Sequence, residues 1–263
     1  GGRHGSNAAG AAGTVFLKAQ GDTWGDLVVD NRGGYQAPSI STELPSVPPG
    51  VIGDGNLMAD SLTQPGATWE SNVWTGYLLT PNRDEGEATL TDNTWFTVTG
   101  NTHDTITVTG GDMTGVANAG DTHGTLFIFD EVVIREKADL TTSGDILIQG
   151  PNLSLSNETT VDTRVVELPV EGSALSVDGS SLLTHDGGLL VSGSVTLAGA
   201  SELSLGWLGI QVSGDLSISD TSEVTQTDGA IDVGGDLVLD NDAVVTLGSA
   251  PVLVDGEVHL NSG

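Results

Sequence analysis

The chain has 263 residues, enough for one or two domains with a large buried core. Its 36 acidic residues against 7 lysines and arginines give a net charge of −29, which argues against nucleic acid and anionic membranes as partners because both would repel it. The chain has no cysteine, which excludes disulfides and thiolate metal sites, and no apolar run approaches the ~20 residues of a membrane span. We expect no nucleic-acid partner and no membrane insertion. The acidic excess favours divalent cations, high salt or cationic partners, and a self-repelling soluble surface is the simpler alternative.

Residues 1–13 are rich in glycine and alanine, which predicts a flexible or extended segment. The residues from there to residue 56 predict a piece of β structure. The motif Gly25-Asp-Leu-Val-Val is close to the Gly-Asp-Leu motifs that begin at Gly214 and Gly235. Four prolines between residues 38 and 49 exclude a central strand. We interpret residues 14–56 as a first solenoid turn followed by a Pro-rich exit loop.

Residues 57–125 have a different composition, with three of the five tryptophans and no 21-residue period. Strand patterns at 94–99 and 104–109, separated by a turn cluster, predict a hairpin, and 73–79 predicts another strand. We expect a small antiparallel β insertion with an aromatic core. Aromatic rings also stack on sugars, so the insertion could instead present a ligand-contact face made of Trp69, Trp74, Tyr77 and Trp95, although such rings more often form the core.

Residues 126–263 carry the repeat around which the chain is organised. Glycines recur every 21 or 22 residues, at Gly150, Gly172, Gly193, Gly214, Gly235 and Gly256. Apolar residues two apart flank each glycine, as in Ile210/Val212 and Leu216/Ile218, so their side chains share one face of a strand. Glycine at the corner fits a sharp bend or a positive φ. The pattern predicts an all-β fold, a right-handed parallel β-helix with turns of about 21 residues and a small antiparallel insertion; a β-sandwich with accidental spacing is the alternative.

The stretch from Gly13 to Asn31 and the repeated Gly-Asp-Leu turns resemble segments of very large secreted bacterial proteins built of right-handed β-helix repeats, of the autotransporter and filamentous-adhesin type. The resemblance covers the chain except for the insertion and includes no catalytic residue. It implies a secreted protein or one on the bacterial cell surface, with a structural or adhesive role.

A column of acidic residues follows the corner glycines. Asp215, Asp236 and Glu257 are spaced by 21 residues and should stack at the strand spacing, where like charges repel by about 1 kcal/mol even in water. Ca²⁺, which takes oxygen ligands, would relieve this repulsion, and outward-pointing side chains screened by solvent are the alternative. Two acidic turns invite the same hypothesis, although neither fits a known calcium loop and solvated turns are the commoner case: Asp84, Glu85 and Glu87 in one, and Asp240 and Asp242 in the other.

The sequence gives little support to catalysis. Cleavage of a polysaccharide needs a placed pair of carboxylates, or a base with a cation that neutralises a uronate, and the regular turns contain almost no cations. No two of the five histidines have metal-ligand spacing, and we expect each at a turn or on the surface. We therefore expect no enzyme, with a carbohydrate-binding or polysaccharide-degrading β-helix protein as the alternative.

The strand pattern continues to Val258, His259 and Leu260, and nothing that resembles a cap follows it. The end of a solenoid presents unpaired strand groups and apolar side chains, which natural proteins cover. These three residues are therefore the expected assembly edge. The resulting prediction is an extracellular rod or filament subunit that stacks end to end or continues in a larger chain, with the insertion as a contact module and carbohydrate as a candidate ligand.

Overall fold

The computed structural model of the chain describes residues 3–4, 8–9, 13–18, 20, 23–31, 41–83, 94–163, 165–185 and 187–261. The chain divides into two compact units. Unit 1 comprises Gly1–Leu44, Ile128–Thr142 and Ile146–Gly263, and unit 2 comprises Pro45–Phe127 and Ser143–Asp145. Apart from one 3₁₀ turn, η1 (Met113–Gly115), the regular structure of the described residues is all β.

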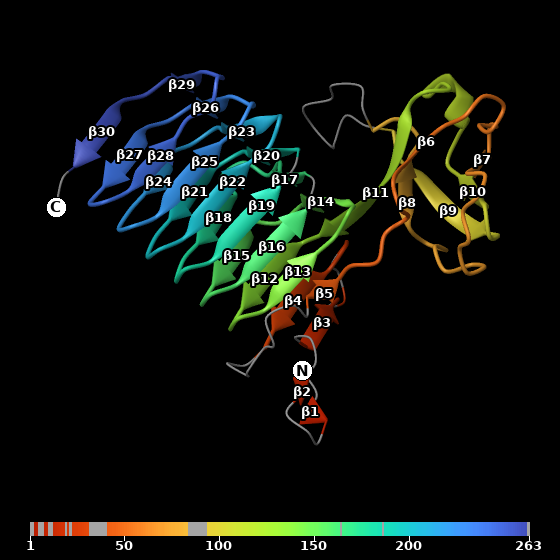
Figure 1. Cartoon of the computed structure of the whole chain (residues 1–263), viewed down its shortest axis with the longest axis horizontal. Helices are drawn as coiled ribbons and strands as arrows, with labels where there is room; N and C mark the ends of the chain where they lie inside the picture. Colours follow the sequence, from red (N-terminus) through yellow and green to blue (C-terminus); the bar gives the residue numbers. More distant parts are fainter. Residues whose placement is uncertain are drawn as a thin grey trace. The chain divides into compact units, whose positions relative to one another are not determined.

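Unit 1 is a parallel β-helix in which each coil contributes one strand to each of three sheets (Figure 1). The first sheet contains, in order, β4 (Asp26–Asp30), β12 (Glu131–Arg135), β15 (Asn152–Ser156), β18 (Ala174–Val177), β21 (Ser194–Leu197), β24 (Leu216–Ile218), β27 (Leu237–Asp240) and β30 (Val258–Asn261). The second contains β5 (Thr42–Glu43), β13 (Asp139–Thr141), β16 (Thr160–Thr163), β19 (Leu182–His185), β22 (Glu202–Leu205), β25 (Glu223–Gln226) and β28 (Val244–Thr246). The third contains β14 (Asp145–Ile148), β17 (Val166–Leu168), β20 (Gly188–Val191), β23 (Gly209–Val212), β26 (Ile231–Val233) and β29 (Val252–Val254).

The coils stack in register because the apolar pairs repeat with the period of the coil. Leu216 pairs with Val195 on one side and with Leu237 on the other, and all three side chains are buried in the interior. Alternate residues face outward and are mostly polar, as expected for a sheet with one face on the core and one in water. The predicted parallel β-helix with turns of 21 or 22 residues is confirmed, and the β-sandwich alternative is wrong.

The corner glycines are required by close contact between coils. A Cβ atom on Gly214 would lie 2.6 Å from Ser194 Oγ and 2.8 Å from the carbonyl oxygen of Gly193. A Cβ on Gly193 would collide with the carbonyl oxygen of Ser173. Of the six repeating glycines only Gly172 has a positive φ, at 76°. Lack of space between stacked corners, and not a left-handed backbone, therefore explains most of the glycine period.

A left-handed conformation does occur at a second corner, where the first sheet ends. The residues stacked there include Glu136, Asn157, Asp220 and Asn241, all with φ between 59° and 62°. Side chains link some successive coils at this corner: Asn157 Nδ2 donates to Glu136 Oε1 at 3.0 Å, and Asn241 Nδ2 donates to Asp220 Oδ1 at 3.3 Å. Asparagine and aspartate tolerate this conformation better than most residues, which accounts for their place there.

The first coil of unit 1 is interrupted. β4 pairs in parallel with β12, which lies 105 residues later in the sequence instead of 21 or 22. β3 (Gly13–Leu17) pairs antiparallel with β4 and forms the first edge of that sheet, and the short strands β1 (Arg3–His4) and β2 (Ala8–Ala9) pair with each other. The chain enters unit 2 at Pro45 and re-enters unit 1 at Ile128, whereas the sequence suggested an insertion over residues 57–125.

Unit 2 is antiparallel, as predicted for the insertion. Its strands are β6 (Gly50–Val51), β7 (Ser61–Thr63), β8 (Leu78–Thr80), β9 (Phe96–Asn101), β10 (Thr105–Thr109) and the first part of β11 (Thr122–Phe129), ordered β11-β8-β9-β10-β7 with β6 on β11. The hairpin predicted around residues 100–103 is β9–β10. The strand expected over 73–79 is only Leu78–Thr80, because the chain turns at Asn72 and Gly76, where φ is 61° and 92°.

Candidate functional site

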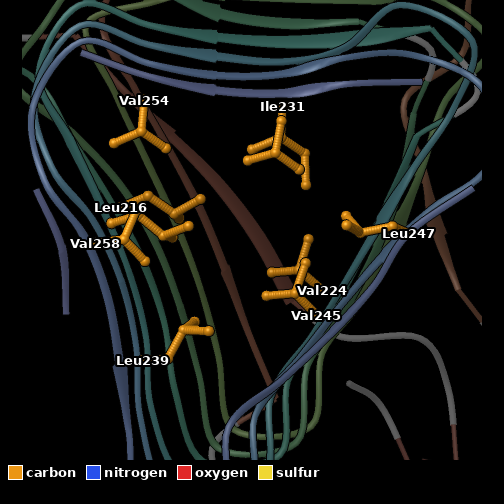
Figure 2. A pocket seen from close by; sticks show the side chains of 10 residues that line it. Leu216, Val224, Ile231, Leu239, Val245, Leu247, Val254 and Val258 are labelled. Carbon is orange, nitrogen blue, oxygen red and sulfur yellow. The ribbon is translucent and has the colours of Figure 1, made fainter. Parts of the chain in front are cut away.

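An apolar hollow opens at the end of unit 1 that β28, β29 and β30 form. Its volume is about 580 Å³, and the residues that line it are all leucine, isoleucine or valine. Figure 2 shows Leu216, Val224 and Ile231 deeper along the interior, with Val245, Leu247, Val254 and Val258 from the last coil around them. The hollow is therefore the interior of the β-helix, open at this end. Among the described residues, no further coil covers it.

The interior columns are buried in β4, which β3 covers, and exposed in β30. Leu27 in the first coil and Val258 in the last occupy one column, and their exposed fractions are 2% and 55%. Val29 and Leu260 occupy the neighbouring column, with exposed fractions of 0% and 72%. Two of the three residues predicted to form an assembly edge, Val258 and Leu260, thus lie at an apolar surface, whereas His259 lies beside the carboxylates of Asp236 and Glu257. Surfaces of this kind mark interaction sites when they are contiguous.

At the opposite end of unit 1, β3 covers the edge of β4 and is itself exposed, with Val15, Phe16 and Leu17 each about half exposed. This strand hydrogen-bonds to the outer edge of β4 over five residue pairs, from Gly13↔Asp30 to Leu17↔Asp26. Phe16 pairs with Leu27 and therefore lies on the interior side, where its ring packs edge-on against Phe129 with centroids 6.4 Å apart. A parallel strand could reach β4 at this edge only by displacing β3.

At the open end, β28, β29 and β30 each pair with one strand only, the corresponding strand of the preceding coil. Their outer edges have no strand partner among the described residues. Unpaired N–H and C=O groups along an edge bind a further strand readily, and pockets beside them select its side chains. An apolar hollow surrounded by three such edges is suited to bind the end of another β-helical coil.

The acidic column that suggested Ca²⁺ makes hydrogen bonds between coils. Asp215 Oδ1 accepts from the backbone N–H of Asp236 at 2.9 Å, and Asp236 Oδ1 accepts from that of Glu257 at 2.8 Å. His259 Nε2 lies 3.6 Å from Asp236 Oδ2 and 3.5 Å from Glu257 Oε2. One oxygen of each of the two aspartates thus binds the next coil, and the structure gives these side chains a role in stacking.

No group of three or more His, Asp or Glu side chains in the described part of the chain is arranged to hold a metal ion. Asp240 Oδ1 accepts from Asn261 Nδ2 at 2.6 Å, a further contact between coils, and Asp242 is exposed in the turn before β28. The third acidic set, Asp84, Glu85 and Glu87, lies outside the described residues. Calcium binding stays a prediction.

The aromatic residues of unit 2 divide into a buried ring and partly exposed ones. Trp74 is 9% exposed, packs in the core, and has its ring 5.5 Å from that of Tyr77; Tyr77 in turn lies 6.0 Å from Phe127. Trp69, Tyr77 and Trp95 are half-buried, and burial raises the pKa of the Tyr77 hydroxyl. Trp74 is thus a core residue, and Trp69, Tyr77 and Trp95 keep part of their surface in solvent.

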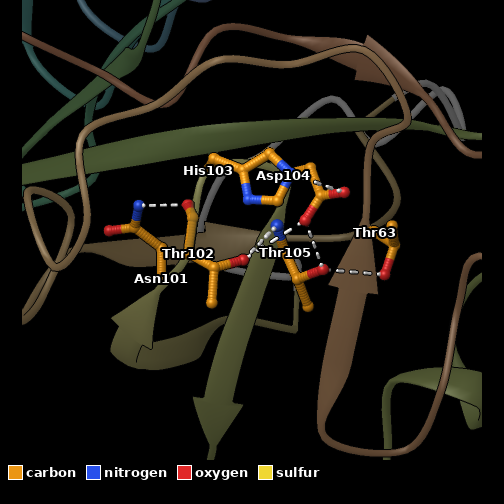
Figure 3. Close-up of polar contacts among 6 residues, drawn as sticks. All are labelled: Thr63, Asn101, Thr102, His103, Asp104 and Thr105. Atoms are coloured by element: carbon orange, nitrogen blue, oxygen red, sulfur yellow. Dashed lines mark hydrogen bonds and ion pairs between the residues drawn. The ribbon is translucent and has the colours of Figure 1, made fainter.

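Asn101 fixes the loop that carries these rings. Its Oδ1 accepts from the backbone N–H of Trp74 at 3.1 Å, and its Nδ2 donates to the carbonyls of Glu70 and Thr102, each at 2.8 Å. Figure 3 shows the adjoining turn, in which Asp104 accepts from the hydroxyls of Thr102 and Thr105. Sequence reasoning treated this turn only as a hairpin connection and missed that a buried asparagine organises it.

A buried polar cluster in unit 2 was also missed. Arg83 Nη2 lies 3.0 Å from Asp145 Oδ1 in an ion pair whose side chains are almost fully buried. His123, which we expected at a turn or on the surface, is 1% exposed in β11, and its Nε2 lies 3.0 Å from Gln64 Oε1. Burial, with the nearby Arg83 charge, lowers the pKa of His123 to about 4. Arg83, His123 and Asp145 are too far apart in the sequence for a spacing motif to connect them, so the sequence offered no signal for this cluster.

Comparison with known proteins leaves the chain without a family. No family model, curated protein or solved structure matches it. Among the described residues, no helix is long and apolar enough to cross a bilayer.

Proposed function

We propose that this protein is an extracellular structural or adhesive protein, a rigid β-helical rod that assembles end to end through the coil formed by β28, β29 and β30. The observation that carries the proposal is the contrast along one interior column, where Leu27 is buried and Val258 is more than half exposed. Apolar area of this kind stabilises an association by about 25 cal/mol per Å² removed from water. In this proposal the hydrogen bonds that repeat between successive coils make the rod rigid.

The composition supports the same role. A net charge of −29 keeps neighbouring rods apart along their sides, so that association is confined to the end where the interior is bare. Unit 2 has its own apolar core and partly exposed rings at Trp69, Tyr77 and Trp95, and it serves in this proposal as the contact or ligand-binding module. The resemblance to secreted bacterial β-helix proteins supports a location at the cell surface.

Analytical ultracentrifugation of the purified chain tests the assembly step. The wild-type chain is expected to self-associate at micromolar concentration, and Leu260→Asp is expected to stay monomeric because it places a charge on the apolar end. Thr196→Asp, on the exposed outer face of β21, is the matched control and should associate like the wild type. Equal association of the Leu260 and Thr196 variants would contradict the proposed role of this end.

A further inference from the structure

His123 is a buried titratable side chain that uses only one of its two ring nitrogens. It is 1% exposed in β11, and its Nε2 lies 3.0 Å from Gln64 Oε1. An amide oxygen only accepts, so Nε2 carries the proton of the neutral ring and Nδ1 is left as a bare acceptor. Nδ1 has no hydrogen-bond partner among the described residues. A buried polar atom without a partner lowers stability, so its presence calls for an explanation.

The surroundings of the ring oppose a second proton. Burial, with the positive charge of Arg83, lowers the pKa of His123 to about 4. Asp145 is already the partner of Arg83, at 3.0 Å, and Gln64 is uncharged. The carboxylate of Asp121, two residues before the histidine, accepts a hydrogen bond from a backbone N–H at 2.7 Å. Protonation of Nδ1 would therefore place a donor without an acceptor and a second positive charge in the interior of unit 2.

Residues 46–52, which lead the chain into unit 2, lie along β11. The backbone N–H of Val47 donates to Thr125 Oγ1 at 3.0 Å, and that of Ile52 donates to the carbonyl of Asp121 at 2.8 Å. Between them, β6 pairs with β11 at two residue positions and with no other described strand. An element attached along a single edge opens at a lower free energy than the central strands β9 and β10, which have a partner on each side.

The imidazole lies where this segment meets β11. His123 is directly opposite Gly50 in the pairing of the two strands. The Gln64 side chain that the ring holds packs on the same glycine, because a Cβ atom on Gly50 would collide with Gln64 Nε2. We propose that His123 is an acid-sensitive latch: its neutral ring keeps residues 46–52 closed on β11, and protonation releases them. The imidazolium reaches water only by leaving this contact, which frees Gln64 and uncovers Gly50.

Release of residues 46–52 would open the core of unit 2. Val47 and Ile52 are 1% and 2% exposed and belong to its apolar cluster. Acid would thereby change the surface of the unit to which the proposed function assigns contact or ligand binding. The latch concerns unit 2 alone and does not depend on end-to-end assembly of unit 1, so either proposal can fail without the other.

The open state takes up the proton, because a released imidazole regains its ordinary pKa of about 6.5. Opening is therefore unaffected by pH well above 6.5, becomes more favourable as the pH falls below 6.5, and gains nothing further below about pH 4. From these two pKa values, the equilibrium constant for opening rises about 30-fold between pH 7.5 and pH 5.

Hydrogen–deuterium exchange between pH 7.5 and pH 5, with each rate divided by that of an unstructured peptide at the same pH, measures the opening. The amides of Val47 and Ile52 are expected to lose about 30-fold in protection, while those of β9 and β10 keep theirs. In His123→Gln, which cannot take up the proton, the loss should disappear. His103→Gln, at a side chain that is 73% exposed, is the matched control and should behave like the wild type.

Gln64→Glu tests the same contact by the opposite route. It places a carboxylate on Nε2, so the protonated ring gains a partner and residues 46–52 should stay closed at pH 5. Loss of protection that spreads equally to β9 and β10 would show acid unfolding of the whole unit and would overturn the latch. Protection of residues 46–52 that is independent of pH in the wild type, or a loss as large as the wild type's in either variant, would also overturn it.

Discussion

Asp236 Oδ1 accepts a hydrogen bond from the backbone N–H of Glu257, 21 residues later, at 2.8 Å. Asp215 does the same for Asp236 at 2.9 Å, and Ser194 Oγ accepts from the N–H of Asp215 at 3.2 Å. Ser194, Asp215 and Asp236, each directly after a corner glycine, therefore bind the coil that follows. This relationship links the sequence period to the stacking of the coils.

Removing one acceptor from this column should weaken the coil. Asp236→Ala leaves the N–H of Glu257 without its side-chain partner and is expected to lower the free energy of unfolding by about 1 kcal/mol. Asp236→Asn keeps an amide oxygen at the same place and should lose less. Urea denaturation of the three proteins measures the difference; equal stability of all three would show that this hydrogen bond contributes nothing.

The calcium hypothesis makes a prediction that separates ion binding from screening. Binding at Asp215, Asp236 and Glu257 would raise the melting temperature in millimolar CaCl₂ above its value in NaCl of equal ionic strength. The increase should disappear in a chain with Asp215→Asn and Asp236→Asn. The same melting temperature in the two salts would contradict calcium binding, and the aspartates would then have only their role in stacking the coils.

The corner glycines that touch the preceding coil should tolerate no side chain. In Gly214→Ala the added Cβ would lie 2.6 Å from Ser194 Oγ, which forces neighbouring coils apart and is expected to cost about 1–3 kcal/mol of stability. Gly115→Ala is the control, because a Cβ there meets no atom within 4 Å. Thermal unfolding followed by circular dichroism compares them, and a Gly214→Ala chain as stable as Gly115→Ala would contradict the close packing of the corners.

Unit 2 should lose stability in mild acid through His123. The pKa of this side chain is about 4 in the folded chain and about 6.5 when unfolded, so the unfolded chain binds the proton more readily. Stability is therefore full above pH 6.5 and falls as the pH drops from there toward 4, by about 3 kcal/mol at most.

His123→Gln removes the titrating group and should flatten the stability profile between pH 6.5 and 5, as measured by urea denaturation in that range. His103→Gln, at an exposed hairpin position, is the control and should keep the wild-type slope. A wild-type slope in the His123 variant would assign the pH dependence to other groups.

The sequence predicted the parts of the fold that repeat. Columns such as Leu216–Leu237 and the glycines at Gly214 and Gly235 are visible as a period because every coil meets the same contacts. What escaped prediction does not repeat. The sequence predicted β structure after residue 13, where β3 lies, but it could not predict that β3 pairs antiparallel with β4. The order of residues could not show that His123 and Arg83 would be buried together in unit 2.

The candidate site was predicted in part for the same reason. Val258, His259 and Leu260 continue the period, and the structure places them at the bare end of the coil. At the other end, β3 pairs with β4 outside the repeat, so the period could not predict it. Trp69, Trp74, Tyr77 and Trp95 were named as a possible ligand-contact face, which stays a prediction. Only packing distinguishes Trp74, in the core, from Trp69 and Trp95, which are half-buried.

Hydrogen–deuterium exchange at low and high protein concentration shows whether the end of unit 1 formed by β28, β29 and β30 is an assembly surface. We expect amides of β28, β29 and β30 to gain protection as the concentration rises, because their open edges become paired. Amides of β21 and β22, in the middle of the β-helix, should not change. Protection in β28–β30 that is independent of concentration would contradict the claim that this end is an assembly surface.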